Sequence, residues 1–108
     1  MQKLRIYDVA LAMAGEAAVI GRRIERFDRD LARQVRRSST AVPLNVAEGM
    51  CARGANKQAR YQTAMAEANE TVAAVQVAKV AGYLEEVDVT KLLDRLDHIT
   101  AVMWKLTH

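Results

Sequence analysis

Apolar residues recur along the chain with the period of an α-helix. Between residues 4 and 27 they fall at steps of three and four, the spacing that lines one face of a helix. The members of this line are Ile6, Val9, Met13, Ala17, Ile20, Ile24 and Phe27. A second apolar line, which runs beside it, consists of Leu4, Tyr7, Leu11, Ala14 and Ala18. This width predicts either a wide core-facing side within the chain or burial against a second subunit.

The same periodicity continues through three further stretches. A second helix, capped by Asp28 or Asp30, follows the first, and a third, capped by Asn56, is predicted to end at Gly82. A fourth helix is predicted to begin at Asp88 or Thr90 and has a heptad-like apolar line. Helices of about 17 to 22 residues with short loops predict an all-α fold, an antiparallel up-and-down four-helix bundle about 30 Å long.

The chain's one proline, Pro43, lies inside the predicted second helix. Proline has no amide hydrogen and its ring crowds the carbonyl four residues earlier, here that of Ser39, so we expect a kink. The hydroxyls of Ser38, Ser39 and Thr40 lie one turn upstream, where they can bond backbone carbonyls. A new helix starting at Pro43 is the alternative, but Val42 would cap it poorly and the apolar pattern runs through without a break.

The composition fits one helical domain that covers residues 1–108. Hydrophobic residues make up 51% of the chain and aromatic residues only 5%, so close helix packing must replace bulky aromatic filling. A single cysteine, Cys51, cannot form an internal disulfide, which favours a reducing compartment. An early charge at Asp8 argues against an ordinary signal peptide, and no apolar stretch approaches the roughly 20 residues of a membrane span. We expect a soluble cytoplasmic protein with no membrane partner.

The sequence contains no catalytic constellation, so we expect neither an enzyme nor a cofactor. A di-iron bundle needs Glu-x-x-His pairs, and neither His98 nor His108 has a glutamate three residues earlier, so no metal site is predicted. Asn45 and Glu48 lie on the flank of the second helix, where they are predicted to hydrogen-bond across a helix or subunit boundary. Glu70, on one helix face with Glu67, is expected to bind basic groups at such a boundary.

The central part of the chain resembles the family of 23S rRNA intervening sequence proteins. Residues 31–37 read LARQVRR and residues 42–49 read VPLNVAEG, which is similar to that family's glutamine, arginine pair and Pro-x-Asn-Ile-Ala-Glu-Gly signature. Further family-like features are residues 3–10, Glu70, residues 78–84 and residues 103–106. The chain departs from the family pattern where Ser38 and Ser39 replace the usual alanines and Ala66-Glu67 replaces small residues such as Gly-Ser.

The resemblance implies a four-helix bundle without known catalysis that tends to assemble as a homopentamer. Relatives in that family include accessory proteins of diversity-generating retroelements, which bind nucleic acid and a reverse transcriptase. From this resemblance we expect the chain to bind itself, and we consider RNA, DNA or a nucleic-acid-bound protein as further partners.

Positive charge is concentrated in the middle of the sequence. Residues 22–60 contain ten basic and four acidic residues, a net charge of +6 in a chain whose total is +3. The basic residues, the predicted nucleic-acid-binding set, are Arg22, Arg23, Arg26, Arg29, Arg33, Arg36, Arg37, Arg53, Lys57 and Arg60. In a bundle, the first five of these would gather around the first inter-helix loop and the last three around the second, at opposite ends, where phosphate contacts add and release counterions.

A scaffold subunit without a nucleic-acid role is the alternative, because the same arginines can pair with acidic residues of the chain or of a neighbouring subunit. Only Phe27 and Tyr61 are interleaved with the basic residues, so the sequence gives little support for stacking of single-stranded bases.

Overall fold

The computed structural model describes residues 5–108, which form the four predicted helices. They are α1 (Arg5–Glu25), α2 (Arg29–Cys51), α3 (Gly54–Val80) and α4 (Thr90–Thr107). No β-strand occurs within these residues, so the predicted all-helical class is confirmed. Leu4 and the beginning of the 3–10 stretch lie outside the described residues. None of the helices in the described part is long and apolar enough to cross a bilayer.

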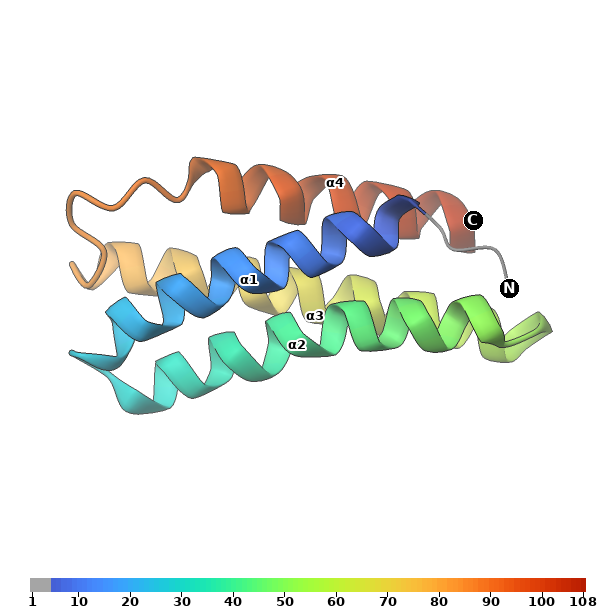
Figure 1. The fold of residues 1–108 in the computed structure, drawn as a ribbon, viewed down its shortest axis with the longest axis horizontal. Coiled ribbons are helices and arrows are strands. Elements are labelled where there is room, and N and C mark those ends of the chain that lie inside the picture. Colours follow the sequence, from blue (N-terminus) through green and yellow to red (C-terminus); the bar gives the residue numbers. More distant parts are fainter. Residues whose placement is uncertain (1–4) are drawn as a thin grey trace.

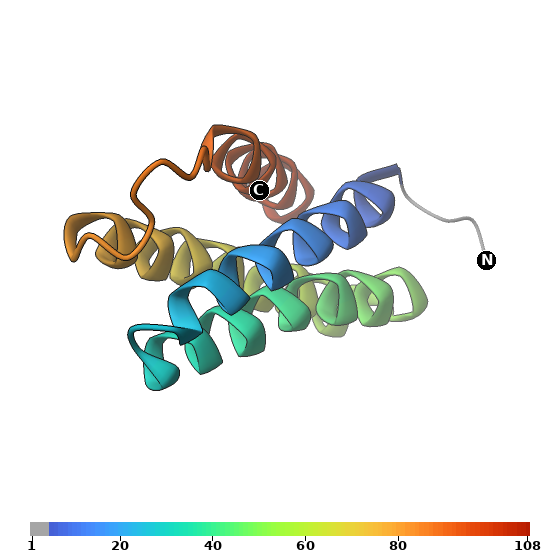
Figure 2. The same ribbon diagram turned by 60° about the vertical axis from the view of Figure 1, so that its left-hand side comes forward.

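Each helix runs in the opposite direction to the one before it (Figure 1). Helix α1 packs against α2 and α4, and α3 packs against the same two helices, which leaves one shared core between all four (Figure 2). The bundle measures 43 × 22 × 22 Å, longer than the predicted 30 Å. The main reason is α3, whose 27 residues exceed the predicted helix length.

The two helix starts in the middle of the chain differ in how they are capped. The Asp28 carboxylate accepts a hydrogen bond from the Leu31 amide at 2.9 Å, so Asp28 rather than Asp30 caps α2. The predicted cap of α3 at Asn56 is wrong, because the helix begins two residues earlier. Its cap position is Arg53, which makes no side-chain capping bond, and Gly54 supplies a positive φ of 57°.

Helix α3 ends on the predicted glycine. Gly82 has a φ of 82°, and its amide donates to the Lys79 carbonyl at 3.1 Å. The Tyr83 amide donates to the Ala78 carbonyl at 2.9 Å, which completes a Schellman motif. Residues 81–89 then lead to α4, a longer connection than predicted. It ends where the Asp88 carboxylate accepts from the Thr90 amide at 2.9 Å.

Helix α2 continues through Pro43 without interruption, so the alternative of a new helix at this residue is wrong. The kink angle itself stays a prediction. Ser38 and Ser39 do bond upstream carbonyls, those of Val35 at 3.4 Å and Arg36 at 3.3 Å, rather than the carbonyl that Pro43 leaves without its helical partner.

Small residues bring α2 and α3 close together. A Cβ atom on Gly49 would lie 2.3 Å from the ring of Tyr61, which is only 3% exposed. Further along, the hydroxyls of Ser38 and Thr71, both fully buried, form a hydrogen bond of 2.7 Å between the helices. The sequence pattern did not predict Thr71 as a core residue, because it indicated apolar positions only.

Two expectations for α1 turn out differently. Phe27, the last member of its first apolar line, lies beyond the end of the helix and is 61% exposed, so its predicted core position is wrong. In the second line, Leu11 is 46% exposed and Ala14 and Ala18 are half-buried. Tyr7 of this line packs partly buried against the core. The chain's own helices therefore cover the second line only in part, and Leu11 meets solvent in the single subunit.

Substitution of Gly49 by alanine is expected to lower the free energy of unfolding by about 1–3 kcal/mol, because the Tyr61 ring must move out of a packed position. The matched control is Gly15→Ala in α1, where a Cβ meets no atom within 4 Å. That control should raise stability by about 0.5–1 kcal/mol through helix propensity. Urea denaturation of both variants checks the pair, and equal effects would contradict the tight α2–α3 approach.

Candidate nucleic-acid interface

The structure separates the ten predicted basic residues into groups with different surroundings. Arg22 and Arg23 lie in the last turn of α1, Arg26 follows in the loop, and Arg29 and Arg33 lie in the first turns of α2. This end of the bundle is called the basic end below. Arg36 and Arg37 lie farther along α2. The remaining three, Arg53, Lys57 and Arg60, surround the α2–α3 turn at the opposite end of the bundle.

Arg36 is held against α1. Its guanidinium pairs with Glu25 at 3.2 Å, and a Cβ atom on Gly21 would lie 3.3 Å from its Cγ. The glycine therefore gives the aliphatic part of Arg36 room to cross α1, and the ion pair ties the end of α1 to α2.

Arg37 binds two carboxylates of α3. Its guanidinium lies 3.0 Å from Glu67 and 2.6 Å from Glu70, and the Glu67 side chain is only 17% exposed. The two carboxylates raise the pKa of Arg37 above its ordinary value, and the hydrogen bond from Arg37 is the main cause that lowers the pKa of Glu70. Glu67, one of the departures from the family pattern, thus fills the α2–α3 boundary together with an arginine.

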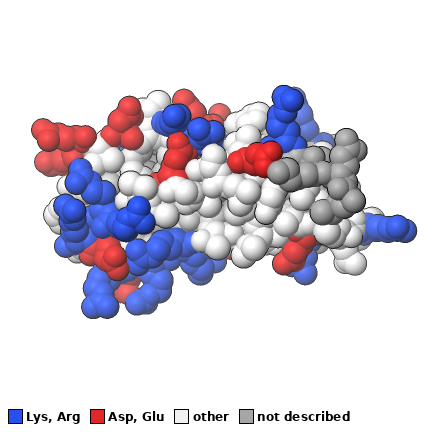
Figure 3. Space-filling model, viewed as in Figure 1, with Lys and Arg blue, Asp and Glu red and all other residues white. Residues whose placement is uncertain are grey.

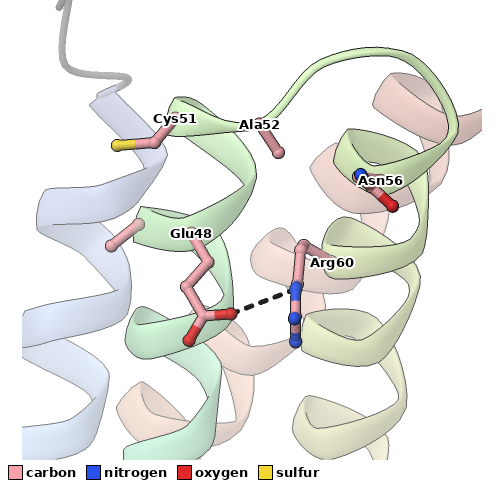
Figure 4. Close-up of a pocket in the computed structure, with 6 residues that line it drawn as sticks. Glu48, Cys51, Ala52, Asn56 and Arg60 are labelled. Atoms are coloured by element: carbon pink, nitrogen blue, oxygen red, sulfur yellow. Dashed lines mark ion pairs between the residues drawn. The ribbon is translucent and has the colours of Figure 1, made fainter.

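The α2–α3 turn has polar contacts of its own (Figure 4). The Glu48 carboxylate accepts from the Arg60 guanidinium at 3.0 Å, across the two helices, and Lys57 lies 5.7 Å from the Tyr61 ring centre. The Asn45 amide donates to the Ala41 carbonyl at 2.9 Å, within its own helix. Asn45 therefore makes no bond across a helix boundary among residues 5–108, whereas Glu48 does.

Most arginines at the basic end have no carboxylate partner within residues 5–108. Within residues 5–108, Arg22, Arg23, Arg26 and Arg29 make no ion pair, and Arg33 has only an exposed one with Asp30 at 3.4 Å. Figure 3 shows Lys and Arg side chains gathered at the lower left of the molecule, where α1 ends and α2 begins, with Asp and Glu side chains among and above them. Basic residues outnumber acidic ones in this part of the chain, so this end carries an excess of positive charge.

Two aromatic rings also lie at the basic end, and sequence reasoning missed one of them. Phe27 stacks on Tyr83 with ring centroids 5.2 Å apart and an angle of 5° between the ring planes. Tyr83 is far from Phe27 in the sequence, and a pattern of single-helix periodicity carries no signal for a contact between two loops. A hollow of about 270 Å³ next to the rings is lined by Arg23, Arg26, Phe27, Gly82, Tyr83 and Glu85.

Two further features of the described residues concern metal binding and the hollow beside the α2–α3 turn. No group of three or more histidine, cysteine, aspartate or glutamate side chains in residues 5–108 could hold a metal ion. A hollow of about 590 Å³ beside the α2–α3 turn is wide open to solvent, and its lining includes Glu48, Arg60 and the exposed side chain of Cys51. Glu48 and Arg60 neutralise each other there, so this hollow contains no isolated charge for a substrate.

Comparison with known proteins agrees with the observed fold. The family model of the 23S rRNA-intervening sequence protein matches residues 2–105. The chain belongs to this family. The solved structure of a protein of unknown function from the S23 ribosomal protein family of Bacteroides thetaiotaomicron is similar to it, with a TM-score of 0.86 and 18% identity over 94% of this chain and 97% of that one. At this identity the likeness concerns the fold alone. No curated protein matched the chain.

The part of the 23S rRNA-intervening sequence family signature that runs from Pro43 to Gly49 occupies the second half of α2 in this member. Its glycine, Gly49, lies under Tyr61, and its glutamate, Glu48, pairs with Arg60. Its proline, Pro43, is buried inside the continuous helix. In this chain the signature is therefore part of the α2–α3 boundary, and the basic end lies outside it.

Replacement of Arg37 by glutamine is expected to lower Tm by about 2–5 °C at pH 7. Arg37 lowers the folded-state pKa of Glu70, so its stabilising effect is complete above the ordinary glutamate pKa, about 4.3, and disappears as pH falls through the folded value. Thermal melts of both proteins from pH 7 to pH 2 should therefore converge at the acidic end. Arg22→Gln, which removes an arginine without a carboxylate partner in residues 5–108, is the control and should show no such convergence.

Proposed function

We propose that this chain is a non-enzymatic, self-assembling bundle of the cytoplasm that binds nucleic acid through its basic end. The observation that carries the proposal is the group of four arginines, Arg22, Arg23, Arg26 and Arg29, which have no carboxylate partner within residues 5–108. Guanidinium groups that are not neutralised internally are available for phosphates, each of which adds affinity by the release of counterions.

The ion pairs of the other arginines support the basic end as the nucleic-acid-binding surface. Arg36, Arg37 and Arg60 serve contacts between helices, so a phosphate would have to compete with an existing carboxylate. Arg22, Arg23, Arg26 and Arg29 meet no such competition within residues 5–108, and Arg33 meets only the exposed carboxylate of Asp30. The predicted nucleic-acid-binding set therefore narrows to the basic end, with Arg33 at its margin. Arg53 and Lys57, at the opposite end, remain separate candidates.

Self-assembly would increase the affinity of the basic ends for nucleic acid. The exposed apolar side of α1, with Leu11 at its centre, is the surface we propose for contact with a second copy. A homopentamer, the assembly that the family resemblance implies, would repeat the basic end around an axis and present a larger cationic surface. Such an assembly suits an accessory role beside a nucleic-acid-bound protein such as a reverse transcriptase.

A scaffold subunit without a nucleic-acid role is the second candidate. The Arg37 pair with Glu67 and Glu70 favours it, because this chain already uses arginine and carboxylate groups as links between helices. In this alternative the basic end would bind acidic side chains of a neighbouring subunit or of another protein.

Removal of two charges by Arg26→Gln and Arg29→Gln is expected to weaken binding of duplex DNA and structured RNA and to reduce the salt slope, d log K/d log [salt], by about two. Fluorescence anisotropy across a salt series measures both. Lys91→Gln with Lys105→Gln on α4 removes the same net charge elsewhere and should leave the slope nearly unchanged. If the unmodified protein binds neither nucleic acid even at low salt, the nucleic-acid role fails and the scaffold role gains support.

Replacement of Leu11 by glutamate is expected to convert the assembly into single subunits, since a charge would be buried between copies. The side chain is 46% exposed in one subunit, so the fold itself should survive. Sedimentation velocity at micromolar concentrations measures the assembly, and circular dichroism measures the fold. Val77→Glu, at an exposed apolar position of α3, is the control and should keep the assembly. A protein that is monomeric before any substitution would contradict self-assembly.

A further inference from the structure

We propose that the stacked pair of Phe27 and Tyr83 is a binding site for an unpaired nucleotide of a single-stranded nucleic acid, whose base stacks on Phe27 while Arg23 and Arg26 hold its phosphates. This inference rests on the proposed nucleic-acid role and adds to it the kind of strand that is bound. It depends on the placement of two aromatic rings within a group of unpaired arginines.

The free side of Phe27 is the stacking surface. The rings are nearly parallel with centroids 5.2 Å apart, which is an offset stack, so Tyr83 covers part of one face of the Phe27 ring. Phe27 nevertheless remains 61% exposed, so its opposite face lies open to solvent. Every base has an aromatic face that can occupy such a position, so this kind of contact is tolerant of sequence.

Backbone hydrogen bonds hold both rings in place before any ligand arrives. The Phe27 amide donates to the Ile24 carbonyl at 2.9 Å, which closes the turn after α1. On the other side, the Tyr83 amide donates to Ala78 at 2.9 Å in the motif that ends α3. Since neither ring depends on a long flexible segment, little conformational entropy is lost when a base stacks on them.

The hollow beside the rings is lined by two cationic side chains and one anionic side chain. Arg23 and Arg26, neither with an ion-pair partner in residues 5–108, line one part of the hollow of about 270 Å³. The Glu85 carboxylate lines another part, 3.6 Å from the position of a Cβ atom on Gly82. Phosphates are attracted to the two guanidinium groups and repelled by the Glu85 carboxylate.

An unpaired nucleotide fits these features better than other polyanions. The bases of a duplex are stacked on each other and cannot reach Phe27 without being flipped out, which costs free energy. An acidic peptide carries the charge for the arginines but no ring system for the aromatic face. The strand with accessible bases is the ligand that uses both parts of the site.

The matched control is the second aromatic stack of the molecule, which lies at the other end of the bundle. Trp104 stacks on His108 with centroids 3.3 Å apart, and Trp104 is 54% exposed, similar to Phe27. It lies in the last turns of α4, away from the basic end. Phe27→Ala and Trp104→Ala therefore each remove an exposed stacked ring, one within the arginine group and one far from it.

Fluorescence anisotropy tests the site with a labelled 12-nucleotide adenine strand, an abasic strand of the same length, a duplex of the same length and polyglutamate. Phe27→Ala is expected to weaken binding of the adenine strand about tenfold, which corresponds to the loss of roughly one stacked base. It should leave the abasic strand, the duplex and polyglutamate unaffected, and Trp104→Ala should leave all four unaffected. Phe27→Tyr keeps a planar ring and should bind like the unmodified protein.

The outcomes separate this inference from the proposed function. One outcome is that the unmodified protein binds the duplex and the abasic strand in a salt-dependent way, and that Phe27→Ala binds the adenine strand as tightly as the unmodified protein does. This result would overturn the stacking site and support nucleic-acid binding by the basic end. An equal loss for polyglutamate and the adenine strand also overturns it, because the ring would then serve an acidic protein partner. If no nucleic acid binds the unmodified protein, the proposed function and the stacking site fail together.

Discussion

The close approach of α2 and α3 is the constraint on which the rest of the bundle depends. With aromatic residues at only 5% of the chain, the core cannot be filled by large rings and relies on short distances between helices. Gly49 leaves room for the one ring that is fully enclosed there, Tyr61, and the Ser38–Thr71 hydrogen bond satisfies two hydroxyls that the short distance buries. A larger residue at Gly49 would meet the Tyr61 ring, and loss of the Thr71 hydroxyl would remove the hydrogen bond that joins the two helices here.

This short distance also decides what the arginines do. Where α2 lies against α1 or α3, guanidinium groups reach carboxylates of the neighbouring helix, as Arg36 reaches Glu25 and Arg37 reaches Glu67. Those charges contribute to the contact between helices and are neutralised by it. Arg26 and Arg29 lie at the end of the bundle, where α1 has ended and α2 has just begun. Among residues 5–108, neither forms an ion pair with a carboxylate of another helix. The same residue type is therefore structural in the middle of the bundle and free at its end.

The turns that follow α1 and α3 place two aromatic rings at the basic end. The tight turn after α1 directs Phe27 away from the core, and the glycine motif at the end of α3 brings Tyr83 next to it. These two loops contain no regular structure, yet their backbone bonds fix the rings beside Arg23 and Arg26. A loop-borne group on a rigid bundle is a common way for proteins to present a binding surface.

The sequence by itself determined the helical class and the number of helices, because steps of three and four between apolar residues report directly on a helix and need no knowledge of its neighbours. It also identified Asp28 as one of two cap candidates and Gly82 as a stop, since both act through local backbone bonds. The tertiary structure decided which arginines are neutralised, that Thr71 belongs to the core, and that Phe27 is exposed and stacks on Tyr83. Each of these depends on a contact between residues far apart in the chain, and the period of a single helix contains no information about such contacts.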